Sequence, residues 1–219
     1  MAGKIIKLED FLKNIDFFIE EAKTWKIFVY PTDTIYGIWW IFPDTLKKVY
    51  KIKQRPTSKK VSIIWPKVYE NLNKVLEDLS VVIDKKIKSQ LYKVIYNLRN
   101  KWEWWTIIWY IKSNRFFQTT AKNKNIKFYL DDFIRQVYKD NTLWVRILNH
   151  PFQEFVDKLW KPFITTSANI SWEEVIRKID DLPEQIYDKV DWIIDWGILD
   201  GKPSVLIDVK ENEVKIIER

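Results

Sequence analysis

Residues that could bind a phosphorylated substrate stand in two short polar stretches of the chain. Lys53 and Arg55 are two positions apart at the end of an expected helix, where both could project toward one anionic group. Ser167 and Asn169 follow an apolar segment and offer a hydroxyl and an amide at the end of a strand. A solvated helix end and an ordinary polar turn would carry the same residue types. Taken alone, each pair leaves both interpretations open.

A second set of residues could bind the polar groups of a small substrate. Thr32 and Thr34 flank Asp33 in a short loop, where their hydroxyls could bind a ligand or satisfy the backbone of the loop. Arg146 lies in an otherwise apolar strand, and an unpaired charge there would be costly. It therefore needs an anionic partner, either a structural Asp or Glu or the carboxylate of a substrate.

The composition of the chain excludes several kinds of chemistry. No cysteine and a single histidine among 219 residues exclude disulfides and a thiol nucleophile, and argue against a zinc site or a Ser-His-Asp triad. The net charge of +7 suits a polyanion such as ATP or RNA, or reflects only a solvated lysine surface. No apolar run approaches the roughly 20 residues that cross a bilayer, and no signal core opens the chain, so we expect a cytoplasmic protein.

The elements that must position these residues alternate between helices and strands. The apolar patterns predict helices at residues 8–24, 44–55, 67–79, 84–99, 126–140 and 150–159. They predict strands at residues 26–30, 61–65, 106–111, 143–147, 162–166, 191–195, 203–209 and 213–218, the last two as a hairpin. Polar loops at the carboxyl ends of strands favour an α/β sheet with a ligand cleft at those ends. We expect a single domain over residues 1–219, with a lysine- and asparagine-rich insertion at 112–141.

Four short motifs follow one another along the chain. They are YPTDTIYG at residues 30–37, Lys53-Gln54-Arg55-Pro56, LWVRILNHP at 143–151 and TTSANIS at 165–171. In this order and spacing the chain resembles the YrdC/Sua5 family of L-threonylcarbamoyladenylate synthases. The resemblance runs from about residue 25 to the end of the chain, outside the insertion. It implies a YrdC-like domain with a twisted mixed sheet, flanking helices and a concave basic cleft, in the short form of the family.

The activity that the resemblance implies is an adenylyl transfer. L-threonine, bicarbonate and ATP would give threonylcarbamoyl-AMP and pyrophosphate, with no protein nucleophile and with Mg²⁺ arriving on the triphosphate. A partner threonylcarbamoyl transferase would then modify the tRNA adenosine beside the anticodon, so tRNA itself is a further candidate partner. No membrane and no protein-bound metal are expected.

The resemblance also assigns roles to residues of this chain. Lys53 and Arg55 would be catalytic. The ATP-binding residues would be Lys53, Arg55, Lys59, Thr142, Ser167, Asn169 and Arg219. The threonine-binding residues would be Thr32, Thr34, Arg146, Thr166 and Ser204. Lys59 stands in a stretch that departs from the family pattern, and we interpret His150 as structural.

Tryptophan stands where the family has glycine. The chain has 13 tryptophans and 4 glycines, and the combined 17 of 219, about 8%, is close to the usual glycine share of about 7%. Trp39, Trp144, Trp160, Trp172 and Trp196 occupy glycine positions of the family pattern. Our hypothesis is that most of the tryptophans are glycine in the organism, encoded by UGA codons and translated here with a code that gives tryptophan. In this interpretation Trp39 and Trp40 belong to a glycine turn behind the Thr-Asp-Thr loop.

Two other functions are compatible with these residues. A YrdC-like basic surface could bind structured RNA without catalysis. A paralogue could pass its activated carbamoyl group to another acceptor, as hydrogenase maturation proteins do, although those contain this domain within much longer chains.

Overall fold

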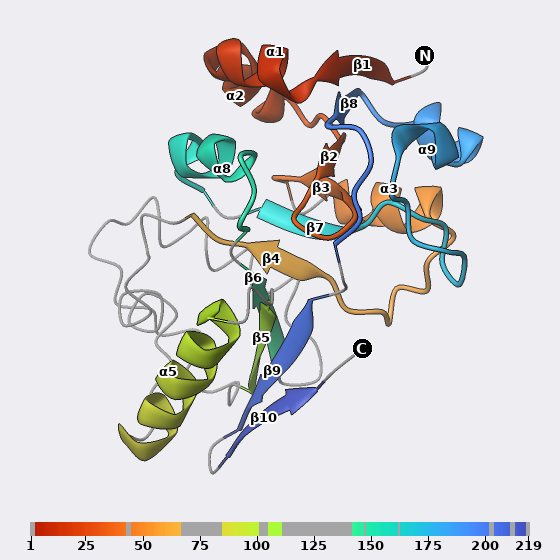
Figure 1. Ribbon diagram of the computed structural model, residues 1–219. Coiled ribbons are helices and arrows are strands. Elements are labelled where there is room, and N and C mark those ends of the chain that lie inside the picture. The colour runs from red at the N-terminus through yellow and green to blue at the C-terminus, as the bar shows by residue number, and fades with distance from the viewer. Residues whose placement is uncertain are drawn as a thin grey trace.

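One mixed sheet runs through the described part of the chain, in the strand order β1-β8-β2-β3-β7-β4-β6-β5-β9-β10 (Figure 1). The computed structural model describes residues 3–42, 45–66, 85–100, 105–110, 142–146, 148–161, 163–201, 204–210 and 213–217. The expected helices at 67–79 and 126–140 and the expected insertion at 112–141 lie outside these ranges. Both parallel and antiparallel strand pairs occur, so the predicted mixed α/β fold is confirmed.

The bounds of the elements are as follows. The strands are β1 (Lys4–Lys7), β2 (Phe28–Pro31), β3 (Tyr36–Trp40), β4 (Ser62–Ile64), β5 (Trp105–Tyr110), β6 (Thr142–Arg146), β7 (Phe163–Ser167), β8 (Trp192–Asp195), β9 (Val205–Val209) and β10 (Val214–Ile217). The helices are α1 (Leu8–Lys13), α2 (Ile15–Ala22), α3 (Thr45–Ile52), α5 (Lys85–Asn100), α8 (Gln153–Leu159) and α9 (Glu184–Tyr187), with a 3-10 turn at Ile179–Asp181.

Helices cover both faces of the sheet, and successive residues of its central strands enter different cores. Along β3, Ile38 and Trp40 pack in one buried cluster with α3 and α5, whereas Trp39 packs in the other with α1, α2 and α8. This alternation follows from the two-residue period of a strand. The central strands are therefore packed between two buried clusters.

Two expectations about secondary structure are wrong. The predicted helix at 8–24 is divided into α1 and α2 at Asn14, whose φ of −108° and ψ of 31° are not helical. The predicted glycine turn at Trp39 and Trp40 is instead the fully buried strand β3, which pairs with β2 on one side and β7 on the other. Trp39 lies opposite Phe28, and the two rings stack with centroids 4.3 Å apart.

The ends of the chain also differ in how well the sequence predicts them. The predicted carboxyl-terminal hairpin is confirmed, because β9 and β10 pair antiparallel and the Lys210 N–H donates to Glu213 O at 3.0 Å. Strand β1 was not predicted, and it pairs in parallel with β8. No helix among the described residues is both long and apolar enough to cross a membrane.

Candidate functional site

A pocket of about 270 Å³ lies where strands β3, β4, β6 and β7 come together. Its lining contains three basic side chains, Arg55, Lys60 and Arg146, and the hydroxyl-bearing Thr32, Thr106, Thr165, Thr166, Ser62, Ser167 and Ser204. The volume is slightly below the roughly 300–1,000 Å³ typical of sites for drug-sized ligands. A pocket of this size suits an amino acid better than a whole nucleotide.

The Thr-Asp-Thr loop connects β2 to β3 and is held by its own side chains. The Thr32 hydroxyl donates to Ile35 O at 2.6 Å and accepts the N–H groups of Thr34 and Ile35, each at 3.1 Å. The loop is also packed from outside, because a Cβ at Gly201 would lie 2.3 Å from Asp33 O. Only glycine therefore fits at position 201, and the segment that follows β8 lies directly on this loop.

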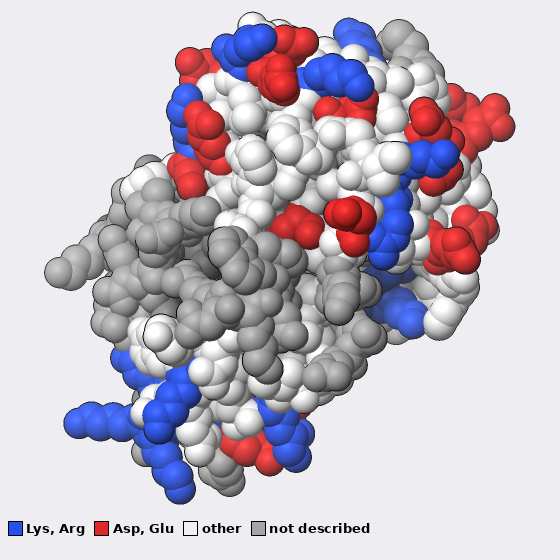
Figure 2. Space-filling model, in the orientation of Figure 1, with Lys and Arg blue, Asp and Glu red and all other residues white. Residues whose placement is uncertain are grey.

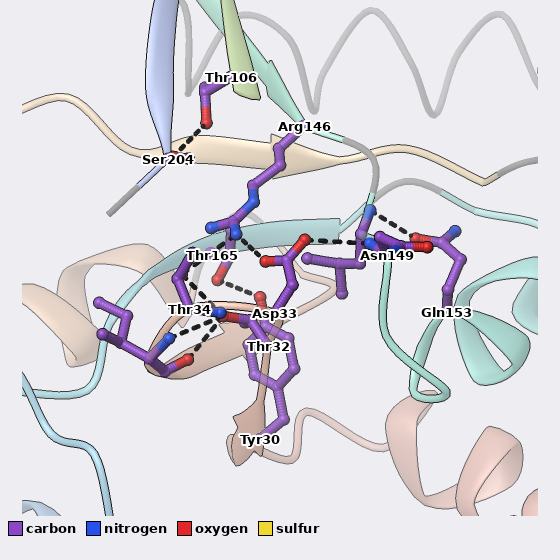
Figure 3. Close-up of polar contacts among 12 residues, drawn as sticks. Tyr30, Thr32, Asp33, Thr34, Thr106, Arg146, Asn149, Gln153, Thr165 and Ser204 are labelled. Atoms are coloured by element: carbon purple, nitrogen blue, oxygen red, sulfur yellow. Dashed lines mark hydrogen bonds and ion pairs between the residues drawn. The ribbon is translucent and has the colours of Figure 1, made fainter. Parts of the chain in front are cut away.

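Arg146, at the end of β6, is paired with Asp33 of this loop (Figure 3). The Asp33 side chain is 2% exposed and that of Arg146 is 12% exposed. Asp33 also accepts the Asn149 N–H at 3.0 Å, and Arg146 Nη2 donates to Thr34 Oγ1 at 3.1 Å. The anionic partner that the sequence required is thus a structural aspartate. A guanidinium has five N–H groups, and the bonds to Asp33 and Thr34 use Nη2 only, so Arg146 retains the Nη1 donors for a ligand.

Lys53 and Arg55 diverge from each other. Gln54, between them and just after the end of α3 at Ile52, has a left-handed φ of 48°. Arg55 reaches the pocket, where its Nη2 donates to Lys60 O. Burial lowers the pKa of Arg55. Lys53 does not line this pocket.

The Lys53 side chain is completely buried behind the Ser-Ala-Asn turn that follows β7. Its Nζ donates to the carbonyl oxygens of Ser167 and Asn169. Burial, and secondly the charge of Arg55, lower the pKa of Lys53 to about 7. The turn is closed further by the Ser167 hydroxyl, which donates to Asn169 Oδ1, and by Asn169 Nδ2, which donates to Glu173 O at 2.7 Å.

The other predicted residues fall into three groups. Thr166 and Ser204 line the pocket, and Ser204 Oγ lies 3.2 Å from Thr106 Oγ1 on β5. Thr142 is buried in β6 and does not line it, and Arg219 lies outside the described residues. Lys59 points elsewhere, with Nζ 3.9 Å from the centroid of the Trp172 ring.

Several residues that line the pocket were not predicted from the sequence. Lys60, rather than Lys59, lines it, and Tyr30 and Thr165 contribute hydroxyl groups. Tyr30 and Thr165 stand within the recognised motifs, so their positions were a usable signal. Nothing in the sequence of the Lys59-Lys60 stretch distinguishes which lysine faces the pocket.

His150 is half-buried beside the site and has a structural contact. Its Nδ1 accepts the Phe152 N–H at 3.2 Å, and burial lowers its pKa to about 4. Within the described residues, no group of three or more His, Cys, Asp or Glu side chains could hold a metal ion.

Comparison with known proteins assigns the chain to a family. The family model Sua5_yciO_yrdC, described as telomere recombination, matches residues 22–102 and 122–219. The chain belongs to the Sua5/YciO/YrdC family.

Named relatives of this Sua5/YciO/YrdC protein cover nearly its whole length. A Methanocaldococcus jannaschii protein, provisionally named threonylcarbamoyl-AMP synthase, is 27% identical over 222 residues, which cover 98% of this chain and 91% of that protein. The threonylcarbamoyl-AMP synthase of Pseudoalteromonas translucida is 24% identical, over 86% of this chain and 89% of that protein. The structure of P. abyssi Sua5 complexed with L-threonine matches with a TM-score of 0.64 at 20% identity. That match covers 98% of this chain but only 56% of Sua5, so this chain spans little more than half of the larger protein.

Several tryptophans of this Sua5/YciO/YrdC chain have a backbone that favours glycine. The described non-glycine residues with positive φ are Gln54, Trp25 (66°), Trp160 (57°) and Trp172 (78°). Trp160 is the left-handed residue that ends α8, a position that glycine prefers.

The tryptophans differ in how their indole N–H groups are satisfied. Trp39 and Trp40 are fully buried with no hydrogen-bond partner for the indole N–H, although buried tryptophans usually find one. Trp192 behaves differently, because its indole N–H donates to Glu21 Oε2 at 2.8 Å. Trp144 is the tryptophan that lines the pocket, beside Arg146 on the same face of β6.

Proposed function

We propose that the chain is a threonylcarbamoyl-AMP synthase, which forms threonylcarbamoyl-AMP and pyrophosphate from L-threonine, bicarbonate and ATP. The observation that carries the proposal is the meeting of all four motifs in one place, within a family whose named relatives are threonylcarbamoyl-AMP synthases. Thr32, Arg55, Arg146 and Ser167, one from each motif, line the same pocket. Residues so far apart in the sequence converge there because their strands are neighbours in the sheet.

The part of this pocket around Arg146 is the proposed threonine site. Arg146 would bind the carboxylate of threonine with the N–H groups that Asp33 and Thr34 leave available. Thr32 and Thr34 would shape this end, since the Thr32 hydroxyl is committed to Ile35 O. Thr166 and Ser204 would complete the contact with the amino acid.

The part of the pocket lined by Arg55 and Lys60 is the proposed entrance for ATP. Arg55 and Lys60 would neutralise phosphate oxygens, and Ser167 lines the same pocket. Lys53 would support this end from behind, by holding the carbonyl groups of the Ser167–Asn169 turn. Lys59, Thr142 and Arg219 stay as proposed ATP contacts from the family resemblance alone.

The chemistry asks the protein for orientation and charge, not for a nucleophile. The amine of threonine takes up bicarbonate as a carbamate and releases water. A carbamate oxygen then attacks the α-phosphate of ATP, and the bond to pyrophosphate breaks. Holding the carbamate and the phosphate in line supplies the advantage of proximity, and cations stabilise the charge on the leaving group.

Further parts of the proposal concern what surrounds the reaction. Mg²⁺ would enter on the triphosphate, since it prefers phosphate oxygens and water to all-protein cages. A threonylcarbamoyl transferase acting on tRNA would consume the product in the cytoplasm.

We also propose that the chain is one domain, with a basic cleft around the pocket. Among the described residues on the face seen in Figure 2, basic and acidic side chains are interspersed.

The direct test is pyrophosphate release by the purified protein. Release should require L-threonine, bicarbonate and ATP together, and Arg55→Ala should reduce it at least about 100-fold, as loss of a preorganised charge contact does in other enzymes. Lys158→Ala, on the exposed face of α8, is the matched control and should keep full activity. Release without threonine, or no release from a chain that binds structured RNA tightly, would contradict the proposal.

We infer further that the natural protein has glycine at most of the tryptophan positions. The left-handed backbone at Trp25, Trp160 and Trp172 supports this, because L-residues there are strained. Reading the codons decides the matter: UGA at these positions agrees with the inference, and UGG contradicts it. The pyrophosphate assay should therefore be run on the printed chain and on a chain with glycine at these positions.

A further inference from the structure

Two residues that line the pocket, Tyr30 and Thr165, have hydroxyl groups that form a buried hydrogen-bonded pair, and the proposed reaction has not used this pair. Tyr30 Oη lies 2.8 Å from Thr165 Oγ1 (Figure 3). Thr165 Oγ1 lies 3.2 Å from Ile38 O. Tyr30 comes from β2 and Thr165 from β7, and both line the pocket.

The direction of these hydrogen bonds follows from the number of available protons. Thr165 has one hydroxyl proton and gives it to Ile38 O, because a carbonyl oxygen can only accept. Tyr30 must therefore donate its own proton to Thr165. Burial raises the pKa of Tyr30, so the phenol keeps that proton at neutral pH. The Tyr30 oxygen is left with lone pairs and no proton to give, so it can only accept from a ligand.

The hydroxyl protons of two neighbouring residues, Thr32 and Ser167, are already donated to acceptors within the protein. The Thr32 hydroxyl donates to Ile35 O, and its oxygen accepts two backbone N–H groups. The Ser167 hydroxyl donates to Asn169 Oδ1. The Tyr30 oxygen is thus a placed acceptor in a residue that lines the pocket together with Arg146.

The ring of Tyr30 is held in this orientation. Gly37 lies opposite Tyr30 in the β2–β3 pair, and a Cβ at Gly37 would be 2.6 Å from the ring. On the other side Phe152 packs with its centroid 4.7 Å from that of Tyr30. The missing side chain at Gly37 makes room for the ring, and the hydroxyl cannot swing out of the pocket without unpacking it.

We propose that the Tyr30 oxygen accepts a hydrogen bond from the β-hydroxyl of the amino-acid substrate, and that Tyr30 is therefore a specificity-determining residue. This inference rests on the proposed function, which places the carboxylate of threonine at Arg146. An apolar pocket rejects an isostere poorly, whereas a placed hydrogen-bonding group separates a hydroxylated substrate from its deoxy analogue. Tyr30 makes that distinction between L-threonine and L-2-aminobutyrate.

Equilibrium binding tests the inference separately from catalysis. Calorimetry would give the Kd of L-threonine and of L-2-aminobutyrate for the parent chain, in its tryptophan and glycine forms, and for Tyr30→Phe. Loss of one neutral hydrogen bond should weaken threonine binding about 5- to 10-fold and leave 2-aminobutyrate binding within about twofold. Two control variants should retain the preference for threonine. Thr165→Ser keeps the hydroxyl pair, and Tyr96→Phe changes a side chain that is 66% exposed.

The outcomes separate this inference from the proposed function. If the parent chain releases pyrophosphate with threonine, but Tyr30→Phe keeps the same ratio of the two Kd values, the role of Tyr30 is wrong and the function stands. If neither form of the chain binds threonine or releases pyrophosphate, both proposals are wrong.

Discussion

Two basic residues that stand together in the sequence have different surroundings in the fold. Lys53 is buried against two carbonyl groups, and Arg55 lines the pocket. The left-handed Gln54 separates them, and no feature of the sequence reveals that turn. A pair that suggested one anion-binding fork therefore becomes one structural support and one candidate ligand contact.

The burial of Lys53 predicts a pH dependence of stability. Its pKa is about 7 in the folded protein and 10.5 in the unfolded chain, so the unfolded chain binds more protons between those values. The free energy of unfolding should therefore rise with pH over that window. Chemical denaturation between about pH 7 and 9, below the range in which tyrosines titrate, should show this rise, and Lys53→Met should remove it. Equal slopes of the free energy of unfolding against pH in the parent protein and in Lys53→Met would contradict the lowered pKa of Lys53.

The Arg146–Asp33 pair predicts a large loss of stability when its charge balance is broken. Asp33→Asn keeps an acceptor for the Asn149 N–H but leaves a buried guanidinium without its counter-charge. We expect a loss of about 3–5 kcal/mol in denaturation experiments. Glu154→Gln, which breaks the exposed pair with Lys158, should cost under about 1 kcal/mol. Similar losses in the two variants would argue against a structural role for Asp33.

At the scale of single elements, the end of α8 gives the sharpest test of the glycine hypothesis. Trp160 ends this helix with left-handed φ and is 52% exposed, so glycine would relieve the backbone strain there. Trp160→Gly should stabilise the protein by about 1 kcal/mol. Trp192→Gly is the matched control, because it removes the bond to Glu21 and the contact with Phe18, and should destabilise by about 3 kcal/mol. Destabilisation by Trp160→Gly would contradict the hypothesis at that position.

The sequence predicted elements best where their pattern was regular. Helix α5 and the hairpin of β9 and β10 lie close to their predicted bounds. Strand β1 was missed because a short Lys-Ile-Ile-Lys segment has no strand signal beyond its pairing with β8. Strand β3 was missed because Trp39 and Trp40 were interpreted through the family's glycines, whereas both indoles pack in the cores on either side of the sheet.

At the scale of the whole molecule, sheet topology explains why four distant motifs meet. β7 lies between β3 and β4, and β6 follows β4, so the ends of these strands surround one pocket. The sequence predicted this convergence from polar loops at strand ends. It could not predict that Asp33 would pair with Arg146, nor that Lys60 rather than Lys59 would face the pocket, because both depend on how the loops turn in three dimensions.

The most direct test of the proposed function is identification of the product. The protein, in its tryptophan and glycine forms, would be incubated with ATP, L-threonine and isotopically labelled bicarbonate. The products would be separated, and their masses would be measured by mass spectrometry. The proposed function predicts a compound that contains AMP, threonine and the labelled carbon, formed in equal amount to pyrophosphate. Formation of pyrophosphate without that compound, or of no nucleotide product by either form, would contradict it.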